Sequence, residues 1–238
     1  MKIYKSQGGP FSERPYYTHQ EIQSICISEL QKVNLYPNEV SPIRIERFIE
    51  KRFGIHTVYK TLPGGVLAYT KFGPRGVEEM VVSRDLVAVE SKSSARRLLS
   101  TWAHEVGHAL LHAHLFVLEN EQLKSLFGEG IAQNEPKILC RDDSVLGGKS
   151  YKNLGYSGQW WEYQANQAIG ALLLPRPLVL KALEGLMVEN GSFGEQILEQ
   201  SHNEEAKYLL SEVFDVNPIV AEFRIKELFD LGKKQLTL

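Results

Sequence analysis

The apolar positions in the first quarter of the chain recur at helical spacing. Thr18 and Glu21 form a capping box, and the helix it predicts carries apolar residues at 22, 25, 26, 30 and 33. The dipeptide Ser41-Pro42 predicts the start of a second helix, with apolar residues at 45, 48 and 49. We expect the residues before Thr18 to form a loose arm.

From Ile55 onward, the sequence has a pattern typical of β-strands. Three apolar runs, 55–61, 66–71 and 77–83, are separated by turns rich in proline and glycine. A further short extended run covers 86–89. These segments predict a small antiparallel sheet.

One strongly amphipathic helix comes next. Ser93 or Ser94 can cap it, and an apolar stripe recurs at spacings of three and four (Leu99, Trp102, Val106 and Leu110). Beyond it we expect helices, with an irregular stretch at about 128–158. The order of helices, sheet and helices predicts an α+β fold. We expect an N-terminal arm (1–17), a main domain (18–200) and a C-terminal helical pair packed on that domain (201–238).

Composition narrows the class of protein. A chain of 238 residues with 43% hydrophobic and 24% charged residues is typical of a soluble globular protein, and a formal charge of −2 gives no general attraction to nucleic acid or membrane. Cys26 and Cys140 lack C-x-x-C spacing, which suits a reducing compartment. The first fifteen residues lack the apolar core of a signal peptide, and Pro175 interrupts the most apolar stretch. We therefore expect a cytoplasmic protein that binds neither membrane nor nucleic acid.

The candidate chemistry lies on the amphipathic helix, which contains the pattern H-E-x-x-H. His104 and His108 lie one turn apart and about 40° apart around the helix, so both can reach one metal ion. Glu105 lies near the same face, where it can take a proton from a metal-activated water. The pattern is typical of a zinc site.

A catalytic zinc usually takes a third protein ligand, and two residues are candidates. His114 has the spacing of the metzincin pattern, but that pattern requires a glycine where this chain has Leu111. If the helix continues, His114 rotates about 240° away from His108. His112 is in phase with His108 but one turn further along, which favours a supporting or surface position.

Glu162 is the other candidate for the third ligand. It lies near the start of a predicted amphipathic helix, and a second helix crossing the first can complete a His2Glu set. Asn166, one turn further on, can accept the outer N–H of a ligating histidine. The alternative is that Glu162 is a solvated residue on the polar face of its helix.

Together these residues resemble a known family. Arg96 and Arg97 ahead of H-E-V-G-H, then E-Y-Q-A-N at 162–166 and L-L-L-P at 172–175, resemble the ImmA/IrrE family of zinc metallo-endopeptidases. The usual family pattern is H-E-x-G-H followed by E-x-x-A-N-x-F-A-A-x-L-L-M-P. This chain has Ala-Ile-Gly at 168–170 and leucine at 174 instead. The resemblance extends from about residue 18 to 231 and includes the segment V-F-D-V-N at 213–217.

The resemblance implies a zincin-like metallopeptidase fold and a gluzincin-type site. Zn²⁺ would be held by His104, His108 and Glu162, with Asn166 in support and Glu105 as the general base. Members of the family cleave helix-turn-helix repressors to switch on stress genes or mobile elements, so the implied partner is a separate protein of that kind. The sheet could bind an extended substrate at its edge. The donor to the oxyanion is not identified; candidates are Arg141, Tyr151, Tyr156 and His202.

Three other readings remain open. The chain could be a non-catalytic, zinc-containing regulatory binding protein, although a structural site has no use for Glu105. Residues 204–231 have helix-turn-helix spacing, but residues 204–234 contain seven acids and five bases, which favours a packed helical hairpin over a DNA reader. Cys140, in a predicted loop, could ligate zinc and silence the enzyme. Arg96 and Arg97 are expected to be solvated or paired.

Overall fold

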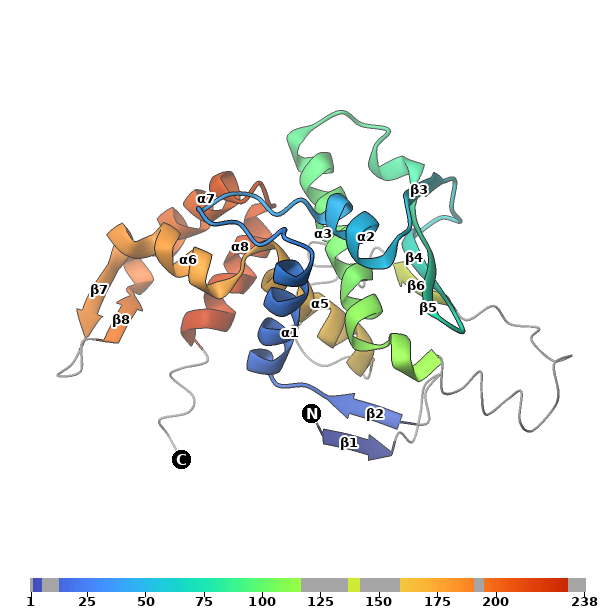
Figure 1. The fold of residues 1–238 in the computed structure, drawn as a ribbon. Helices are drawn as coiled ribbons and strands as arrows, with labels where there is room; N and C mark the ends of the chain where they lie inside the picture. Colours follow the sequence, from blue (N-terminus) through green and yellow to red (C-terminus); the bar gives the residue numbers. More distant parts are fainter. Residues whose placement is uncertain (1, 6–12, 117–136, 142–158, 191–194, 231–238) are drawn as a thin grey trace, which may run out of the picture.

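The computed structural model describes residues 2–5, 13–116, 137–141, 159–190 and 195–230 (Figure 1). Two short strands, β1 (Lys2–Lys5) and β2 (Glu13–Tyr16), pair antiparallel, with Ile3 opposite Pro15. The expected loose arm is therefore wrong for these residues.

Two helices follow the strand pair, α1 (His19–Lys32) and α2 (Ile45–Phe53). The capping box of Thr18 and Glu21 is confirmed at the start of α1. The second helix begins at Ile45 instead of directly after Ser41, so that prediction is wrong. The Ser41 hydroxyl donates to the carbonyl of Glu39, and the turn before Ile45 stays non-helical.

A four-stranded sheet comes next along the chain. It contains β3 (Thr57–Lys60), β4 (Val66–Gly73), β5 (Gly76–Ser83) and β6 (Lys137–Arg141), in the order β3-β5-β4-β6. β4 pairs antiparallel with β5 and β6, whereas β3 is parallel to β5. The prediction of an antiparallel sheet is wrong for β3: β4 and β5 join through a tight turn at which Gly76 has φ 107°, and β3 adds to the far side of β5.

Two further predictions around the sheet are wrong. The segment at 86–89 is not extended: Leu86 is the last residue of the 3₁₀ turn η1 (Arg84–Leu86), and residues 87–89 form a turn and a bend. The Ser83 hydroxyl caps η1 by accepting from the N–H of Asp85. Residues 137–141 lie inside the stretch expected to be irregular, yet they form β6 by pairing with β4.

Two helices build the centre of the molecule. α3 (Lys92–Leu111) packs against the sheet, and α5 (Trp160–Leu173) packs against α3 (Figure 1). The N-cap of α3 is Ser91, slightly earlier than expected, with its hydroxyl accepting from the N–H of Ser94. Trp102, Val106, Ile169 and Leu172 are completely buried in the core that these elements share.

The C-terminal part contains α6 (Arg176–Leu183), the strand pair β7 (Met187–Asn190) and β8 (Glu195–Leu198), α7 (Asn203–Val213) and α8 (Pro218–Ile225). The helical pair is confirmed, and α8 continues as a π turn, η4 (Lys226–Asp230). The β7–β8 pair corrects the expectation that only helices follow α3. The chain is α+β, while its division at 17 and 200 stays a prediction. Within the described residues, no helix is long and apolar enough to span a bilayer.

Candidate metal centre

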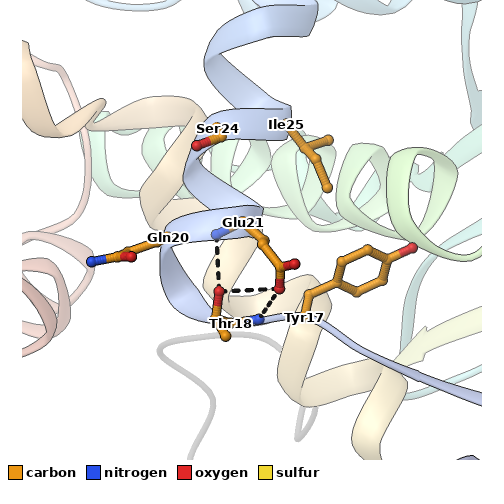
Figure 2. Close-up of a pocket in the computed structure, with 6 residues that line it drawn as sticks. All are labelled: Tyr17, Thr18, Gln20, Glu21, Ser24 and Ile25. Atoms are coloured by element: carbon orange, nitrogen blue, oxygen red, sulfur yellow. Dashed lines mark hydrogen bonds between the residues drawn. The ribbon is translucent and has the colours of Figure 1, made fainter. Parts of the chain in front are cut away.

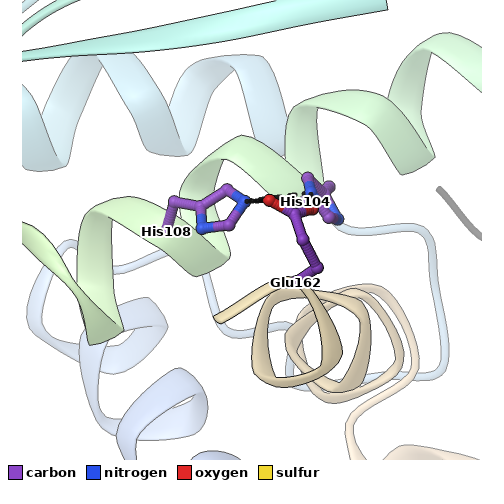
Figure 3. A group of neighbouring side chains, drawn as sticks. All are labelled: His104, His108 and Glu162. Carbon is purple, nitrogen blue, oxygen red and sulfur yellow. Dashed lines mark hydrogen bonds and ion pairs between the residues drawn. The ribbon is translucent and has the colours of Figure 1, made fainter. Parts of the chain in front are cut away.

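Three buried side chains converge between α3 and α5 (Figure 3). One ligand atom from each of His104, His108 and Glu162 lies within 4.8 Å of the others. The Nε2 atoms of the two histidines are 3.0 Å apart, and Glu162 Oε2 lies 3.0 Å from Nε2 of His104. Glu162 Oε1 lies 3.5 Å from Nε2 of His108. This group could hold a metal ion.

The local sequence explains how the two helices reach this spacing. His104 and His108 are one turn apart on α3, so their rings project from the same face. Gly107 lies on the face that meets α5: a Cβ there would lie 2.9 Å from Cβ of Ala168 and 3.0 Å from the backbone of Ala165. The absence of a side chain therefore allows the close approach that brings Glu162 to the histidines.

Burial and the neighbouring histidines act in opposite directions on the pKa of Glu162. Burial alone would raise the pKa of Glu162, but the adjacent rings of His108 and His104 lower it far below its ordinary value. Glu162 is therefore ionised and available as a ligand. Both histidines are completely buried, and Glu162 is nearly so.

The outer ring nitrogens have partners that leave the inner nitrogens free for a metal. Nδ1 of His104 lies 3.1 Å from the acceptor Oδ1 of Asn166, so it carries a proton and donates. This is the contact assigned to Asn166 from the sequence. Nδ1 of His108 lies 3.1 Å from Nδ1 of His112. Burial lowers the pKa of His112 to about 3, so its ring is neutral.

The donor set fits a cation. Only a proton or a metal ion can hold two imidazole nitrogens and a carboxylate so close together, because their electron pairs otherwise repel. Two histidines and one glutamate are ligands typical of a catalytic zinc, with a fourth position left for water or substrate.

Glu105 lies beside this group and is completely buried. The hydroxyl of Thr70, in β4, donates to Glu105 Oε2 at 2.5 Å, and the thiol of Cys140 in β6 also hydrogen-bonds to this carboxyl. Burial raises the pKa of Glu105 to about 7, against the lowering effects of His104 and Thr70. Such a carboxyl can accept and release a proton near neutral pH.

Comparisons with known proteins assign no family to this chain. Neither the scan against protein-family models nor the search of curated proteins finds a match. The resemblance to ImmA/IrrE peptidases therefore stays a prediction from the motifs.

The other candidates from the sequence lie outside the metal-binding group. α3 ends at Leu111 and His114 is exposed, so His114 does not join the group. Cys140 lies in a strand instead of a loop and adjoins Glu105, and it is not among the grouped ligand atoms. Tyr151 and Tyr156 lie outside the described residues.

The three remaining candidates, Arg141, His202 and Arg96, are not part of the metal-binding group. Arg141 is the last residue of β6, and its side chain lies outside the described part of the structure. His202 precedes α7, which does not contribute to the site. Arg96 is paired, as expected: its guanidinium donates to Asp215, Ser211 and Glu212, which joins α3 to the C-terminal helices.

A surface pocket of about 600 Å³ lies at the start of α1 and contains none of these residues (Figure 2). Its polar groups include Thr18 and Glu21, which hydrogen-bond to each other in the capping box. The pocket therefore adds no candidate chemistry.

Sequence reasoning missed two functional contacts, those of Thr70 and Gln164. Thr70 lies in the middle of an apolar strand, where a buried hydroxyl needs a partner, and that was the available signal. Gln164 is buried on α5 and gave no signal, because its partners are distant in sequence.

Proposed function

We propose that this protein is a zinc-dependent endopeptidase that hydrolyses peptide bonds in a protein substrate. The observation that carries the proposal is the buried His104, His108 and Glu162 group with Glu105 directly beside it. A structural metal site does not require such a carboxyl.

Each residue has a defined part in the proposed reaction. His104, His108 and Glu162 would hold Zn²⁺, which when bound supplies Lewis acidity to polarise the scissile carbonyl and acidify a water. Glu105 takes a proton from the attacking water and returns it to the leaving amine. Thr70 fixes the Glu105 carboxyl by donating to Oε2. Oε1 is buried and accepts no hydrogen bond from a nitrogen or oxygen of the described residues, and in this proposal it is the atom that takes the proton.

The position of β6 supports an extended polypeptide as substrate. Among the described strands, β6 is the outer one on the β4 side of the sheet, and its Cys140 adjoins Glu105. A peptide adding antiparallel or parallel to this strand would pass close to the general base. We also propose that the substrate is a helix-turn-helix repressor. Only the motif resemblance supports this part of the proposal.

The test is zinc-dependent appearance of new N-termini. Purified, zinc-loaded protein is incubated with a panel of helix-turn-helix repressors and with a proteome extract, and new termini are identified by mass spectrometry. The matched control is Glu105→Gln, with its zinc content measured to be equal. The proposal predicts new termini with the unmodified protein only; equal termini with Glu105→Gln, or none in either sample, would reject it.

One observation favours a second candidate, a non-catalytic zinc-binding regulatory protein. His104, His108 and Glu105 are all completely buried, and structural zinc sites are closed. This candidate predicts about one zinc per chain, loss of fold on zinc removal, and no new termini in the same experiment.

A further inference from the structure

A series of hydrogen bonds between buried polar groups links the metal-binding group to the N-terminal strand pair. Nδ1 of His108 meets Nδ1 of His112 at 3.1 Å, and Nε2 of His112 meets Oε1 of Gln164 at 2.9 Å. Nε2 of Gln164 then donates to the carbonyl of Pro15, in β2, at 2.9 Å. All four residues are buried, so water does not compete for these groups.

The Pro15 carbonyl, at the end of this series, fixes the direction of every hydrogen bond in it. A carbonyl oxygen only accepts, so the amide nitrogen of Gln164 must face Pro15 and the amide oxygen must face His112. Nε2 of His112 must then carry a proton. His112 is completely buried, and its two ring nitrogens meet an amide oxygen and another imidazole, so the ring has no carboxylate partner among these contacts to hold a second proton. With one ring proton, placed on Nε2, its Nδ1 accepts, and Nδ1 of His108 must be the donor.

We infer that His112, Gln164 and the Pro15 carbonyl are positioning groups that hold His108 as an Nε2 ligand with its proton on Nδ1. The inference rests on the proposed metal site, since it concerns how one ligand is oriented. The opposite arrangement would place the Gln164 oxygen against the Pro15 oxygen, two acceptors without a proton between them.

The arrangement makes β2 part of the metal centre. β2 supplies a backbone carbonyl, and a backbone carbonyl cannot change its hydrogen-bonding sense. The strand pair β1–β2 would thus act on the metal through three side chains, Gln164, His112 and His108, without touching it. Outer partners of ligating histidines are commonly worth 10- to 100-fold in metal affinity.

The first test observes the protons directly in zinc-free protein. Long-range ¹H–¹⁵N spectra of protein labelled with ¹⁵N-histidine distinguish protonated from unprotonated ring nitrogens. We expect a proton on Nδ1 of His108 and none on Nδ1 of His112, with the His112 proton on Nε2. A proton on Nδ1 of His112 overturns the inference, whatever the protein does as an enzyme.

The second test measures zinc affinity by competition with a chromophoric chelator. Gln164→Met has similar length without polar atoms, and His112→Phe keeps a ring against Trp160, whose ring lies 5.5 Å away. Both should weaken zinc binding about 10- to 100-fold. His112→Asn restores an acceptor close to the position of Nδ1 and should recover much of the affinity lost in His112→Phe.

These outcomes separate the inference from the proposed function. Unchanged zinc affinity in Gln164→Met and His112→Phe, with folding verified by circular dichroism, overturns the positioning role. Equal losses in His112→Phe and His112→Asn also overturn it, because they indicate a packing effect. Failure of the unmodified protein to bind zinc refutes the proposed function, and the spectra of the zinc-free protein still decide the hydrogen-bond direction.

Discussion

Replacing Gly107 by alanine should push the two site helices apart. The new Cβ would lie 2.9 Å from Cβ of Ala168 and 3.0 Å from the Cα and carbonyl oxygen of Ala165. Carbon atoms in good contact are about 3.5–4.0 Å apart, so α5 must move by roughly 0.5–1 Å. Because Glu162 lies on α5, this movement exceeds the roughly 0.2 Å tolerance of a zinc–ligand distance.

The energetic effect should appear mainly in zinc binding. Overpacking of this kind costs about 1–3 kcal/mol, while alanine favours the helix by about 1 kcal/mol, so the zinc-free protein should lose only about 0–2 kcal/mol. Zinc must draw the helices together against the same strain. A strain of about 1–3 kcal/mol corresponds to a zinc dissociation constant that is roughly 5- to 150-fold larger.

The assay combines urea unfolding of the zinc-free protein with a zinc titration against a competing chelator. The control is Gly185→Ala, whose added Cβ meets nothing within 4 Å. Gly185→Ala should bind zinc like the unmodified protein. Unchanged zinc affinity in Gly107→Ala would refute the reasoning, because α5 would then have absorbed the new methyl group without moving Glu162.

Three further outcomes are expected. Glu162→Ala should reduce zinc from about one ion per chain to near zero by elemental analysis and remove the rise in melting temperature on zinc addition; retained zinc would exclude Glu162 as a ligand. Arg96→Met should lower the free energy of unfolding by about 1–3 kcal/mol in urea, since each of the three nitrogens of the buried guanidinium donates a hydrogen bond; an unchanged midpoint would contradict this. Burial would raise the pKa of Glu29, but Lys32 and Arg52 lower it below its ordinary value. Its contribution to stability is therefore present above the unfolded pKa of about 4.3 and is lost as pH falls through the lower folded pKa. Zinc-free Glu29→Gln should show a shallower loss of melting temperature than unmodified protein between about pH 5 and pH 3, and parallel curves would count against the ion pairs.

The parts of the fold that depend on local sequence were predictable. The capping box of Thr18 and the α3 helix with its histidine pair follow from spacing and residue type. Residue type also left two states for Arg96, solvated or paired, and the structure shows it paired. Glu162 was found because its helix and its partner Asn166 have a recognisable period.

The features that were wrong or missed depend on distant contacts. The parallel direction of β3 is decided by which edge of the β4–β5 pair remains available, and no local pattern encodes that choice. β6 exists because β4 offers it a partner. The role of His112 depends on Gln164 and Pro15, and the pair Gln164–Pro15 is separated by 149 positions.

That separation has a consequence for synthesis of the chain on the ribosome. Translation proceeds at about 5–20 residues per second, so the acceptor carbonyl of Pro15 is made roughly 7–30 s before Gln164 can reach it. His104 likewise precedes Glu162 by 58 positions. Strand β2 therefore waits for Gln164 before this hydrogen bond can fix it in place. In the same way, the growing chain cannot bring His104, His108 and Glu162 together until α5 has left the exit tunnel.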